Sequence, residues 1–192
     1  MSDPLALVRE WYEEAIEAGL HEPNAMALAT AMPDGAPSVR FLLLKGVDDD
    51  GVRFFTNYES RKGRELEANP RAAIALYWHQ LYRQVRMEGP VGRLPDEDSD
   101  DYFATRAYGS RIGAWASPQG RAIPDRAWLE ARVEEAAAEH PDDDVRRPPY
   151  WGGYLLRPTA VELWQGRPNR LHDRRSFVRG DDGTWREERL AP

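Results

Sequence analysis

The sequence predicts a mainly β protein of the α+β class, in which an antiparallel barrel carries flanking helices. Two observations lead to this fold. Alternating or continuously apolar stretches, separated by turn-forming Pro-Asp-Gly and Asp-Gly sequences, occupy both ends of the chain. Helical periodicity is confined to the N-terminus, one short segment and the middle. A barrel decorated by helices in this way needs no second domain, so residues 1–192 are expected to form a single domain.

The first elements are predicted from caps and turns. Asp3-Pro4 is typical of a helix start, because an N-cap carboxylate precedes a proline at the first helical position, and the apolar stripe that follows stops near Gly19. Strand patterns and one short capped helix come next. They cover Ala25–Met32, Pro37–Val47 and Val52–Asn57 as strands and Ser60–Ala68 as the helix, which Asn69-Pro70 ends.

The remaining elements are read in the same way. Acidic residues in the first turn of Asp96–Thr105 complement the dipole of a helix, and a second helix is expected to begin near Pro124. The sequence on either side of these helices has strand patterns. The strands are Ala72–Trp78, Arg83–Arg93, Gly153–Gln165 and Ser176–Arg186, with a loop at Asp142–Pro149 and a turn at Asp181-Asp182-Gly183.

Composition argues against several classes of function. The net charge is −7, whereas general nucleic-acid binding relies on a basic surface. The absence of cysteine excludes disulfides, thiolate metal sites and cysteine nucleophiles, and the four histidines lack a metal-binding spacing. No apolar run approaches the length of a membrane span, and the N-terminus lacks the pattern of a signal peptide, so a cytoplasmic protein is expected.

Lysine is rare in this chain: Lys45 and Lys62 are the only lysines among 26 lysine and arginine residues. An ammonium group is compact and suits a single phosphate oxygen or a crowded pocket, whereas a guanidinium is a planar fork of donors. The two lysines are therefore candidate anion-binding residues. The alternative is two surface lysines that survived by chance.

Two segments near strand ends carry further candidate anion-binding groups. Arg40 and Lys45 flank an apolar strand that is expected to be buried, and because they are five residues apart they point to opposite faces of a regular strand. Ser60-Arg61-Lys62 follows Thr56 at a helix N-terminus, where free N–H groups and the helix dipole favour phosphate. The alternatives are a core strand with charged ends and a solvated capping turn.

Two later segments supply donors that suit a phosphorylated ligand. Tyr102 and Arg106 are four residues apart on a predicted helix, and Ser110 follows on the next turn or loop. In Arg170–Arg174 three potentially cationic side chains alternate onto one face if the segment is extended. The alternatives are a surface cluster at a helix end and a salt-bridge ladder. Together, the four segments offer more donors than one phosphate needs, which favours two phosphorylated ligands or a cofactor and a substrate.

These four segments, in this order, resemble the pyridoxine/pyridoxamine 5′-phosphate oxidases, a family of flavin enzymes that make pyridoxal 5′-phosphate. The resemblance runs from about Glu22 to Pro192. It implies an antiparallel split β-barrel that forms a homodimer with FMN at the subunit interface. The most specific motifs are Arg83-Gln84-Val85, Ile112-Gly113-Ala114-Trp115, Tyr150-Trp151-Gly152-Gly153 and Arg170-Leu171-His172-Asp173-Arg174.

The resemblance also implies which residues form the site. The FMN-contacting positions of the family match Arg40, Phe41, Leu42, Leu43, Leu44, Lys45, Phe55, Thr56, Arg61, Lys62, Gln84, Gln119, Gly120, Trp164 and Arg174. The substrate-contacting positions match Lys45, Tyr102, Arg106, Ser110, Arg170 and His172. By this resemblance Arg170 and His172 would lie over the pyridine ring as the catalytic residues, and Arg61 and Lys62 would hold the FMN phosphate. The other four substrate positions would clamp the substrate phosphate.

The implied reaction converts pyridoxine 5′-phosphate or pyridoxamine 5′-phosphate to pyridoxal 5′-phosphate. Hydride passes from C4′ of the substrate to N5 of the flavin, and O₂ then reoxidises the flavin and yields hydrogen peroxide. The imine formed from the amine substrate hydrolyses and releases ammonia. In such enzymes the protein contributes orientation and charge, while the cofactor carries the redox chemistry.

Three features depart from the family pattern. Phe55 stands where tyrosine is common, Gly120 replaces a usual serine and lacks its hydroxyl donor, and only a few residues precede the first helix. Two other functions stay open. A phenazine-pathway flavin enzyme of the same fold would share the cofactor residues but generally not the substrate residues. A non-catalytic flavin- or anion-binding module would leave the substrate residues unexplained.

Overall fold

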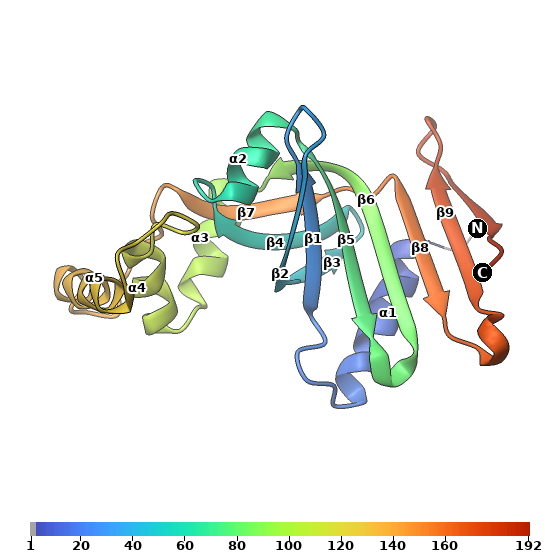
Figure 1. The fold of residues 1–192 in the computed structure, drawn as a ribbon, viewed down its shortest axis with the longest axis horizontal. Coiled ribbons are helices and arrows are strands. Elements are labelled where there is room, and N and C mark those ends of the chain that lie inside the picture. Colours follow the sequence, from blue (N-terminus) through green and yellow to red (C-terminus); the bar gives the residue numbers. More distant parts are fainter. Residues whose placement is uncertain (1–2) are drawn as a thin grey trace.

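A computed structural model describes residues 3–192 of the chain, in which ten strands form one curled antiparallel sheet flanked by helices (Figure 1). In chain order the elements are α1 (Pro4–Glu17), β1 (Ala25–Ala31), β2 (Pro37–Leu43), β3 (Gly46–Asp48), β4 (Gly51–Asn57), α2 (Arg61–Ala68), β5 (Arg71–Trp78), η1 (His79–Leu81), β6 (Arg83–Arg93), α3 (Asp96–Ala104), α4 (Tyr108–Ala116), α5 (Arg126–Glu139), β7 (Trp151–Leu156), β8 (Ala160–Gln165), η2 (Pro168–Arg170), β9 (Asp173–Arg179) and β10 (Trp185–Arg189).

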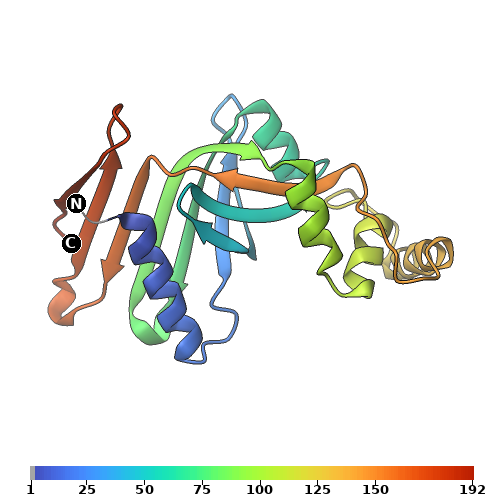
Figure 2. The ribbon, with the colours of Figure 1, turned by 180° about the vertical axis from the view of Figure 1, so that it is seen from behind.

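The long strand β6 connects the two parts of the sheet. Seven strands follow one another in the order β10-β9-β8-β6-β5-β1-β2. The first part of β6, Arg83–Glu88, pairs with β8, whereas Val91–Arg93 at its other end pairs with β7, which in turn pairs with β4. The sheet therefore turns back across the central strands, as both ribbon views show (Figures 1 and 2). This arrangement is an antiparallel split β-barrel, as the sequence predicts.

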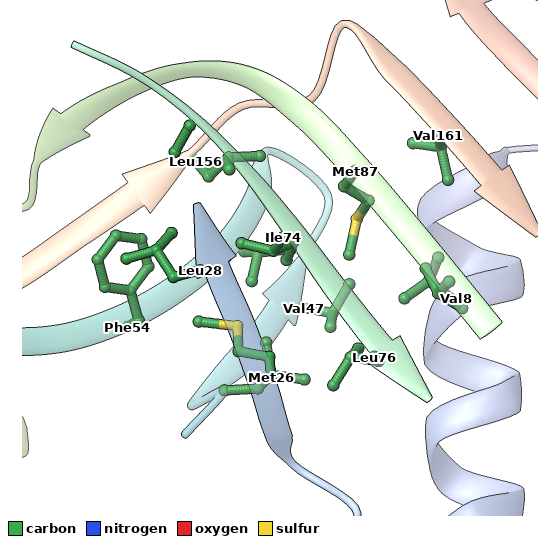
Figure 3. Close-up of a cluster of buried hydrophobic side chains, with 14 of the residues drawn as sticks. Val8, Met26, Leu28, Val47, Phe54, Ile74, Leu76, Met87, Leu156 and Val161 are labelled. Carbon is green, nitrogen blue, oxygen red and sulfur yellow. The ribbon is translucent and has the colours of Figure 1, made fainter. Parts of the chain in front are cut away.

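The main core lies between the two layers of the curled sheet and beneath α1. Figure 3 shows side chains from several elements converging there, among them Val8, Met26, Leu28, Phe54, Ile74, Leu76, Met87 and Leu156. Most of these side chains are fully buried. Burial of a side chain of this size contributes about 1.5–3 kcal/mol each. The amphipathic face of α1 adds Leu5, Val8 and Ala15 to this core and covers one side of the sheet (Figure 2).

A second, smaller core fixes the helices α3, α4 and α5. Its buried members are Phe103, Ile112, Ala116, Ala136, Val145 and Trp151. Because Trp151 is the first residue of β7, this core attaches the helical part to the barrel. In Figure 1 these helices lie at the end of the molecule opposite β8 and β9.

Three predicted elements differ from the structure. The segment Pro37–Val47 is two strands, because Leu44 N–H donates to Asn24 and Lys45 N–H donates to Arg53, so the chain leaves β1 and joins β4. Gly153–Gln165 is also two strands, because Pro158 has no N–H to continue the ladder. Ser110, expected on the next turn or loop after the predicted helix of Tyr102 and Arg106, lies in the first turn of a separate helix, α4, that was not predicted.

The apolar strand that ends in Leu43 is not buried within the chain, contrary to expectation. Strand β2 pairs only with β1 and lies at one end of the sheet. Its outward residues are exposed to 68% at Val39, 78% at Phe41 and 38% at Leu43. Side chains of this kind in a row form an apolar surface rather than part of the core.

Candidate active site

A cavity of about 700 Å³ opens between β2, the end of β4, the N-terminus of α2 and the helices α3 and α4. Both lysines of the chain line it. Arg40 also lines it, together with the next three residues of β2, so both faces of this edge strand contribute to the cavity. The lining residues are Arg40, Phe41, Leu42, Leu43, Lys45, Phe55, Thr56, Lys62, Tyr102, Thr105, Arg106, Ala107, Ser110, Gln119 and Trp151.

One end of the cavity is formed by the N-terminus of α2. Ser60 caps this helix by accepting a hydrogen bond from Gly63 N–H, and the turn requires glycine because a Cβ at residue 63 would lie 2.0 Å from the carbonyl oxygen of Tyr58. The helix therefore begins tightly against β4. Arg61 and Lys62 occupy its first turn, where the helix dipole favours an anion.

Lys62 is surrounded by neutral oxygen atoms. Its Nζ donates to Oε1 of Gln119 at 2.9 Å, to Oγ1 of Thr56 at 3.1 Å and to Oγ of Ser60 at 3.3 Å. Burial and the neighbouring Arg40 guanidinium lower the pKa of Lys62 to about 8, with Glu65 opposing the shift. A bound anion at this position would restore the charged form of the amine.

Arg106 lines the cavity from the junction of α3 and α4. Its guanidinium carbon lies 4.7 Å from the centre of the Trp151 ring and 5.4 Å from that of Phe103. Burial lowers the pKa of Arg106, and its Nη1 is buried without a hydrogen-bond partner among residues 3–192. A buried, unpaired guanidinium nitrogen is costly unless a ligand supplies the acceptor.

Stacked aromatic rings line the cavity as well. Phe55 stacks on Tyr102 with ring centres 3.9 Å apart and on Trp151 at 5.7 Å. The ammonium of Lys45 lies 5.6 Å from the centre of the Tyr102 ring. Phe55, the departure from the family pattern, thus contributes a ring that holds Tyr102 in position.

Three of the four cationic side chains that line the cavity lack a compensating acid among residues 3–192, and the fourth, Arg40, pairs with Glu65. Among the described residues that line it, none is aspartate or glutamate. Lys45, Lys62 and Arg106 form no ion pair with any carboxylate of residues 3–192 within 4.0 Å. Ser110 adds a hydroxyl from the first turn of α4, at another helix N-terminus. The site is therefore suited to an anionic ligand with a flat ring.

A second group of predicted residues lies elsewhere in the chain. Gln84, Trp164 and Arg174 are neighbours across β6, β8 and β9, and His172 lies beside Trp164 with ring centres 4.5 Å apart. His172 Nδ1 accepts a hydrogen bond from the backbone N–H of Arg167 at 3.1 Å, which places the ring proton of the neutral imidazole on Nε2. None of these residues lines the cavity.

Arg170 is not part of an extended strand, so the predicted alternation of Arg170 with His172 and Arg174 is wrong. It ends the short helix η2 with a φ of 61°, directly after Asn169 with a φ of 58°. Two consecutive left-handed residues other than glycine are uncommon, and such backbone conformations concentrate at functional sites. Arg170 is exposed and, like its neighbours in β9, lies away from the cavity of its own chain.

The other predicted cofactor residues lie near the cavity or behind it. The Arg61 side chain is 64% exposed and its Nε donates to Glu65 at 2.8 Å. Gly120 has a φ of 81°, and a Cβ there would lie 3.7 Å from the backbone nitrogen of Arg61. Leu44 is buried in the main core, so only its backbone is available to a ligand.

Three lining residues were not predicted from the sequence: Thr105, Ala107 and Trp151. Trp151 stands in the Tyr150-Trp151-Gly152-Gly153 motif, which therefore carried a signal for the site itself. Thr105 and Ala107 flank Arg106 at the junction of α3 and α4 and carry no such signal.

Residues 12–140 match the family model described as pyridoxamine 5′-phosphate oxidase, and residues 151–192 match the one described as pyridoxine 5′-phosphate oxidase C-terminal dimerisation region. The chain belongs to the pyridoxamine 5′-phosphate oxidase family. Both parts of the candidate site fall within these matches. The first contains Gln84 and every cavity residue except Trp151, and the second contains Trp151, Trp164, Arg170, His172 and Arg174.

Curated members of this family align with almost the whole chain. A protein of Salinibacter ruber named pyridoxine/pyridoxamine 5′-phosphate oxidase is 56% identical over 192 residues, which cover 99% of this chain and 89% of the relative. A protein of Burkholderia lata with the same name is 54% identical over 192 residues, with the same coverages.

Two solved structures resemble the chain. PhzG from Burkholderia lata, in complex with tetrahydrophenazine-1-carboxylic acid, superposes with a TM-score of 0.94 at 34% identity and covers 100% of this chain and 94% of its own. A pyridoxamine 5′-phosphate oxidase-related, FMN binding protein from Nostoc punctiforme has a TM-score of 0.78 at 23% identity, covering 96% of this chain and 97% of its own, and supports the fold.

Among residues 3–192, no helix has both the length and the apolarity to cross a bilayer. Likewise, no three histidine or acidic residues of that range gather as a metal site would require.

Proposed function

We propose that this protein is an FMN-dependent oxidase that converts pyridoxine 5′-phosphate and pyridoxamine 5′-phosphate to pyridoxal 5′-phosphate, with O₂ as acceptor and hydrogen peroxide as product. The observation that carries the proposal is one cavity that is lined by Lys62 from α2, by Arg106 from the junction of α3 and α4 and by aromatic rings, with no aspartate or glutamate among its described lining residues. Cations from two different elements suit two phosphate groups, and the aromatic rings suit flat ligands.

The residues around Lys62 fit the phosphate end of FMN. The desolvated ammonium, the Thr56 hydroxyl and the first turn of α2 form a donor set for a phosphate monoester. Arg61 and Gln119 lie beside it. FMN bound there would supply the redox chemistry by accepting hydride from the substrate.

Arg106 and its neighbours would hold the phosphate of the substrate. The unpaired Nη1 of Arg106, the phenol of Tyr102 and the hydroxyl of Ser110 are donors, and Lys45 adds a charge beside the Tyr102 ring. Fixing the phosphate at this end would place the pyridine ring along the aromatic stack. A substrate that is already held in the reacting orientation loses less translational and rotational entropy on reaching the transition state, which lowers the barrier to hydride transfer.

The remaining site residues would come from a second copy of the chain. Arg170 and His172 lie outside the cavity, but in the region that matches the dimerisation model. The exposed apolar residues of β2 border the cavity and supply a surface for association. In a homodimer, Arg170 and His172 of the partner subunit would close over the pyridine ring, with Trp164 and Arg174 against the flavin. Residues 1–192 would then act as one FMN-binding domain.

The similarity to PhzG raises phenazine oxidation as a second candidate function. Two Burkholderia lata proteins allow a direct comparison, since this chain is 54% identical to the one named pyridoxine/pyridoxamine 5′-phosphate oxidase and 34% identical to PhzG. All six substrate-contacting positions also carry the residue types that the oxidase resemblance requires. Both comparisons favour the vitamin B6 phosphates as substrates.

Purified protein tests the proposal. Flavin absorbance is measured first, and pyridoxine 5′-phosphate, pyridoxamine 5′-phosphate or tetrahydrophenazine-1-carboxylic acid is then added in air. We expect bound FMN and equal amounts of pyridoxal 5′-phosphate and hydrogen peroxide from the first two compounds. Bound FMN with turnover of tetrahydrophenazine-1-carboxylic acid alone would identify phenazine oxidation as the function. Bound FMN without turnover of any of the three compounds would support a non-catalytic binding module instead.

A further inference from the structure

Glu65 is a buried carboxylate directly behind the Lys62 end of the cavity. It lies on α2 and is 1% exposed. Its Oε2 accepts hydrogen bonds from Thr30 at 2.5 Å, Ser38 at 2.6 Å and Arg40 at 3.1 Å, and its Oε1 accepts one from Arg61 at 2.8 Å. Both carboxylate oxygens are thus occupied by donors from β1, β2 and α2.

These donors keep Glu65 ionised. Burial by itself raises the pKa of a carboxyl group, but the hydrogen bonds from Ser38, Thr30, Arg61 and Arg40 outweigh burial and hold the pKa of Glu65 at about 2. The negative charge is therefore present at every pH at which the protein would work.

The carboxylate fixes two arginines: Arg40, which lines the cavity, and Arg61, which precedes the lining residue Lys62 in the first turn of α2. Arg40 donates to Glu65 through Nη2, while its Nη1 donates to Thr30 Oγ1 and to the carbonyl oxygen of Leu28, so its guanidinium is held on both sides. Arg61 donates to Glu65 through Nε, and its two Nη groups have no hydrogen-bond partner among residues 3–192. An arginine that is anchored in this way presents its remaining donors in a fixed direction.

The carboxylate also sets the charge of this end of the cavity. Arg40, Arg61 and Lys62 are three cations, and among residues 3–192 Glu65 is the one carboxylate that pairs with any of them, which leaves a charge of +2. A phosphate monoester carries about −1.5 to −2 at neutral pH. The two charges therefore match.

We propose that Glu65 is a positioning residue for the phosphate of the cofactor, acting through Arg40 and Arg61. The inference rests on the proposed binding of FMN at the Lys62 end of the cavity. It adds a residue that does not face the ligand and that belongs to none of the predicted site positions. A purely structural carboxylate would support the fold and affect every flavin alike, whereas a positioning carboxylate affects the phosphate.

The test compares FMN with riboflavin, which lacks the phosphate, on flavin-free protein. In Glu65→Gln one carboxylate oxygen becomes an amide NH₂ group, which donates and cannot accept. Either Arg61 or Arg40 therefore loses its hydrogen bond to residue 65. We expect FMN to bind at least about tenfold more weakly, as for loss of a charge-assisted hydrogen bond. Riboflavin affinity is expected to change by less than about twofold, because it makes no phosphate contact.

Glu67→Gln is the matched control. Glu67 lies two residues further along α2, its side chain is 71% exposed, and it pairs with Arg93 at 2.9 Å instead of a cavity residue. Both affinities are expected to stay at the wild-type values in this variant. Equal weakening of FMN and riboflavin in folded Glu65→Gln protein, or unchanged FMN affinity, would overturn the inference.

Ser38→Ala keeps the test decisive if Glu65→Gln fails to fold. It removes one donor to Glu65 and one acceptor of Arg40 while the ion pair remains. We expect a smaller loss of FMN affinity, about three- to tenfold, with riboflavin unchanged. No selective loss for FMN in this variant would also overturn the inference. Wild-type protein that binds no FMN would refute the proposed function itself. Failure of the proposed function can therefore be distinguished from failure of the inference about Glu65.

Discussion

The Nζ of Lys62 lies 2.9 Å from Oε1 of Gln119, although 57 residues separate the two in the sequence. Thr56 donates to the same oxygen at 3.0 Å, so three segments of the chain meet around one ammonium group. No carboxylate among the described residues forms an ion pair with that group, and its pKa is low for a lysine. This contact is the structural basis for placing an anion there.

The affinity for FMN is expected to fall as the pH rises above about 8. Burial and Arg40 lower the pKa of Lys62 to about 8 in the free protein, and a bound phosphate raises it, because the phosphate stabilises the charged amine. Above pH 8 the complex therefore keeps a proton on Lys62 that the free protein has lost. The affinity for FMN then decreases by up to about tenfold for each pH unit above the pKa of Lys62 in the free protein. Quenching of flavin fluorescence between pH 7 and 10 measures the effect.

Lys62→Arg serves as the control for this pH dependence. A guanidinium remains charged throughout the range, so the decline above pH 8 should disappear even if the absolute affinity is lower. The same decline in Lys62→Arg as in the wild type would assign the titration to another group.

Replacement of Arg106 by alanine is expected to impair binding of the substrate and leave FMN binding intact. The guanidinium is half-buried over Trp151 with an unpaired Nη1, so it is the donor best placed to bind a phosphate oxygen. Loss of such a charge-assisted bond costs about 1.5–3 kcal/mol, which corresponds to an increase in KM of roughly 10- to 150-fold. Steady-state kinetics with pyridoxine 5′-phosphate measure it.

Arg132→Ala is the corresponding control, since Arg132 lies on α5 and pairs with Glu135 at 2.8 Å. Its KM should equal that of the wild type. An unchanged KM in Arg106→Ala, or loss of FMN from that variant, would show that Arg106 does not hold the substrate phosphate.

Gly120→Ser, which restores the residue usual in the family, is expected to destabilise this protein. The φ of 81° at Gly120 lies in the left-handed region, where a residue with a Cβ costs about 1 kcal/mol or more. A change of that size lowers Tm by roughly 2–4 °C in a chain of this length. Gly113→Ala, inside α4 with open space around its Cβ, should not lower Tm. Thermal unfolding with and without FMN compares the two, and a gain in Tm for free Gly120→Ser would contradict the strain argument.

Local signals in the sequence were sufficient for much of the fold. The Asp3 cap, the Ser60 cap and the acidic first turn after Pro95 place α1, α2 and α3 within a residue or two of their observed starts. Turn sequences likewise separate β1, β2 and β4. The spacing of Tyr102 and Arg106 also places both side chains at one cavity, although α3 ends between them.

Features that depend on tertiary contacts could not be predicted from the sequence pattern. At Leu44 and Lys45 the backbone changes its hydrogen-bonding partner from the segment before β1 to β4, and this change depends on which strands lie beside it. The apolar sequence of β2 predicts burial, but it does not tell whether the same chain or another molecule covers the strand. Glu65 looks like an ordinary exposed helical residue until Thr30, Ser38 and Arg40 are brought against it. The distance between Arg170 and the cavity is set by the sheet order and has no local signal.

The most direct test of the shared active site is complementation between two inactive subunits. Arg106→Ala damages the cavity and Arg170→Ala the group that we assign to the partner, so each homodimer should oxidise pyridoxine 5′-phosphate poorly while retaining FMN. A heterodimer purified through two different affinity tags would contain one intact site of its two symmetry-related sites, so about half of the wild-type activity per dimer is predicted. Activity no greater than that of either homodimer would contradict an active site built from two subunits.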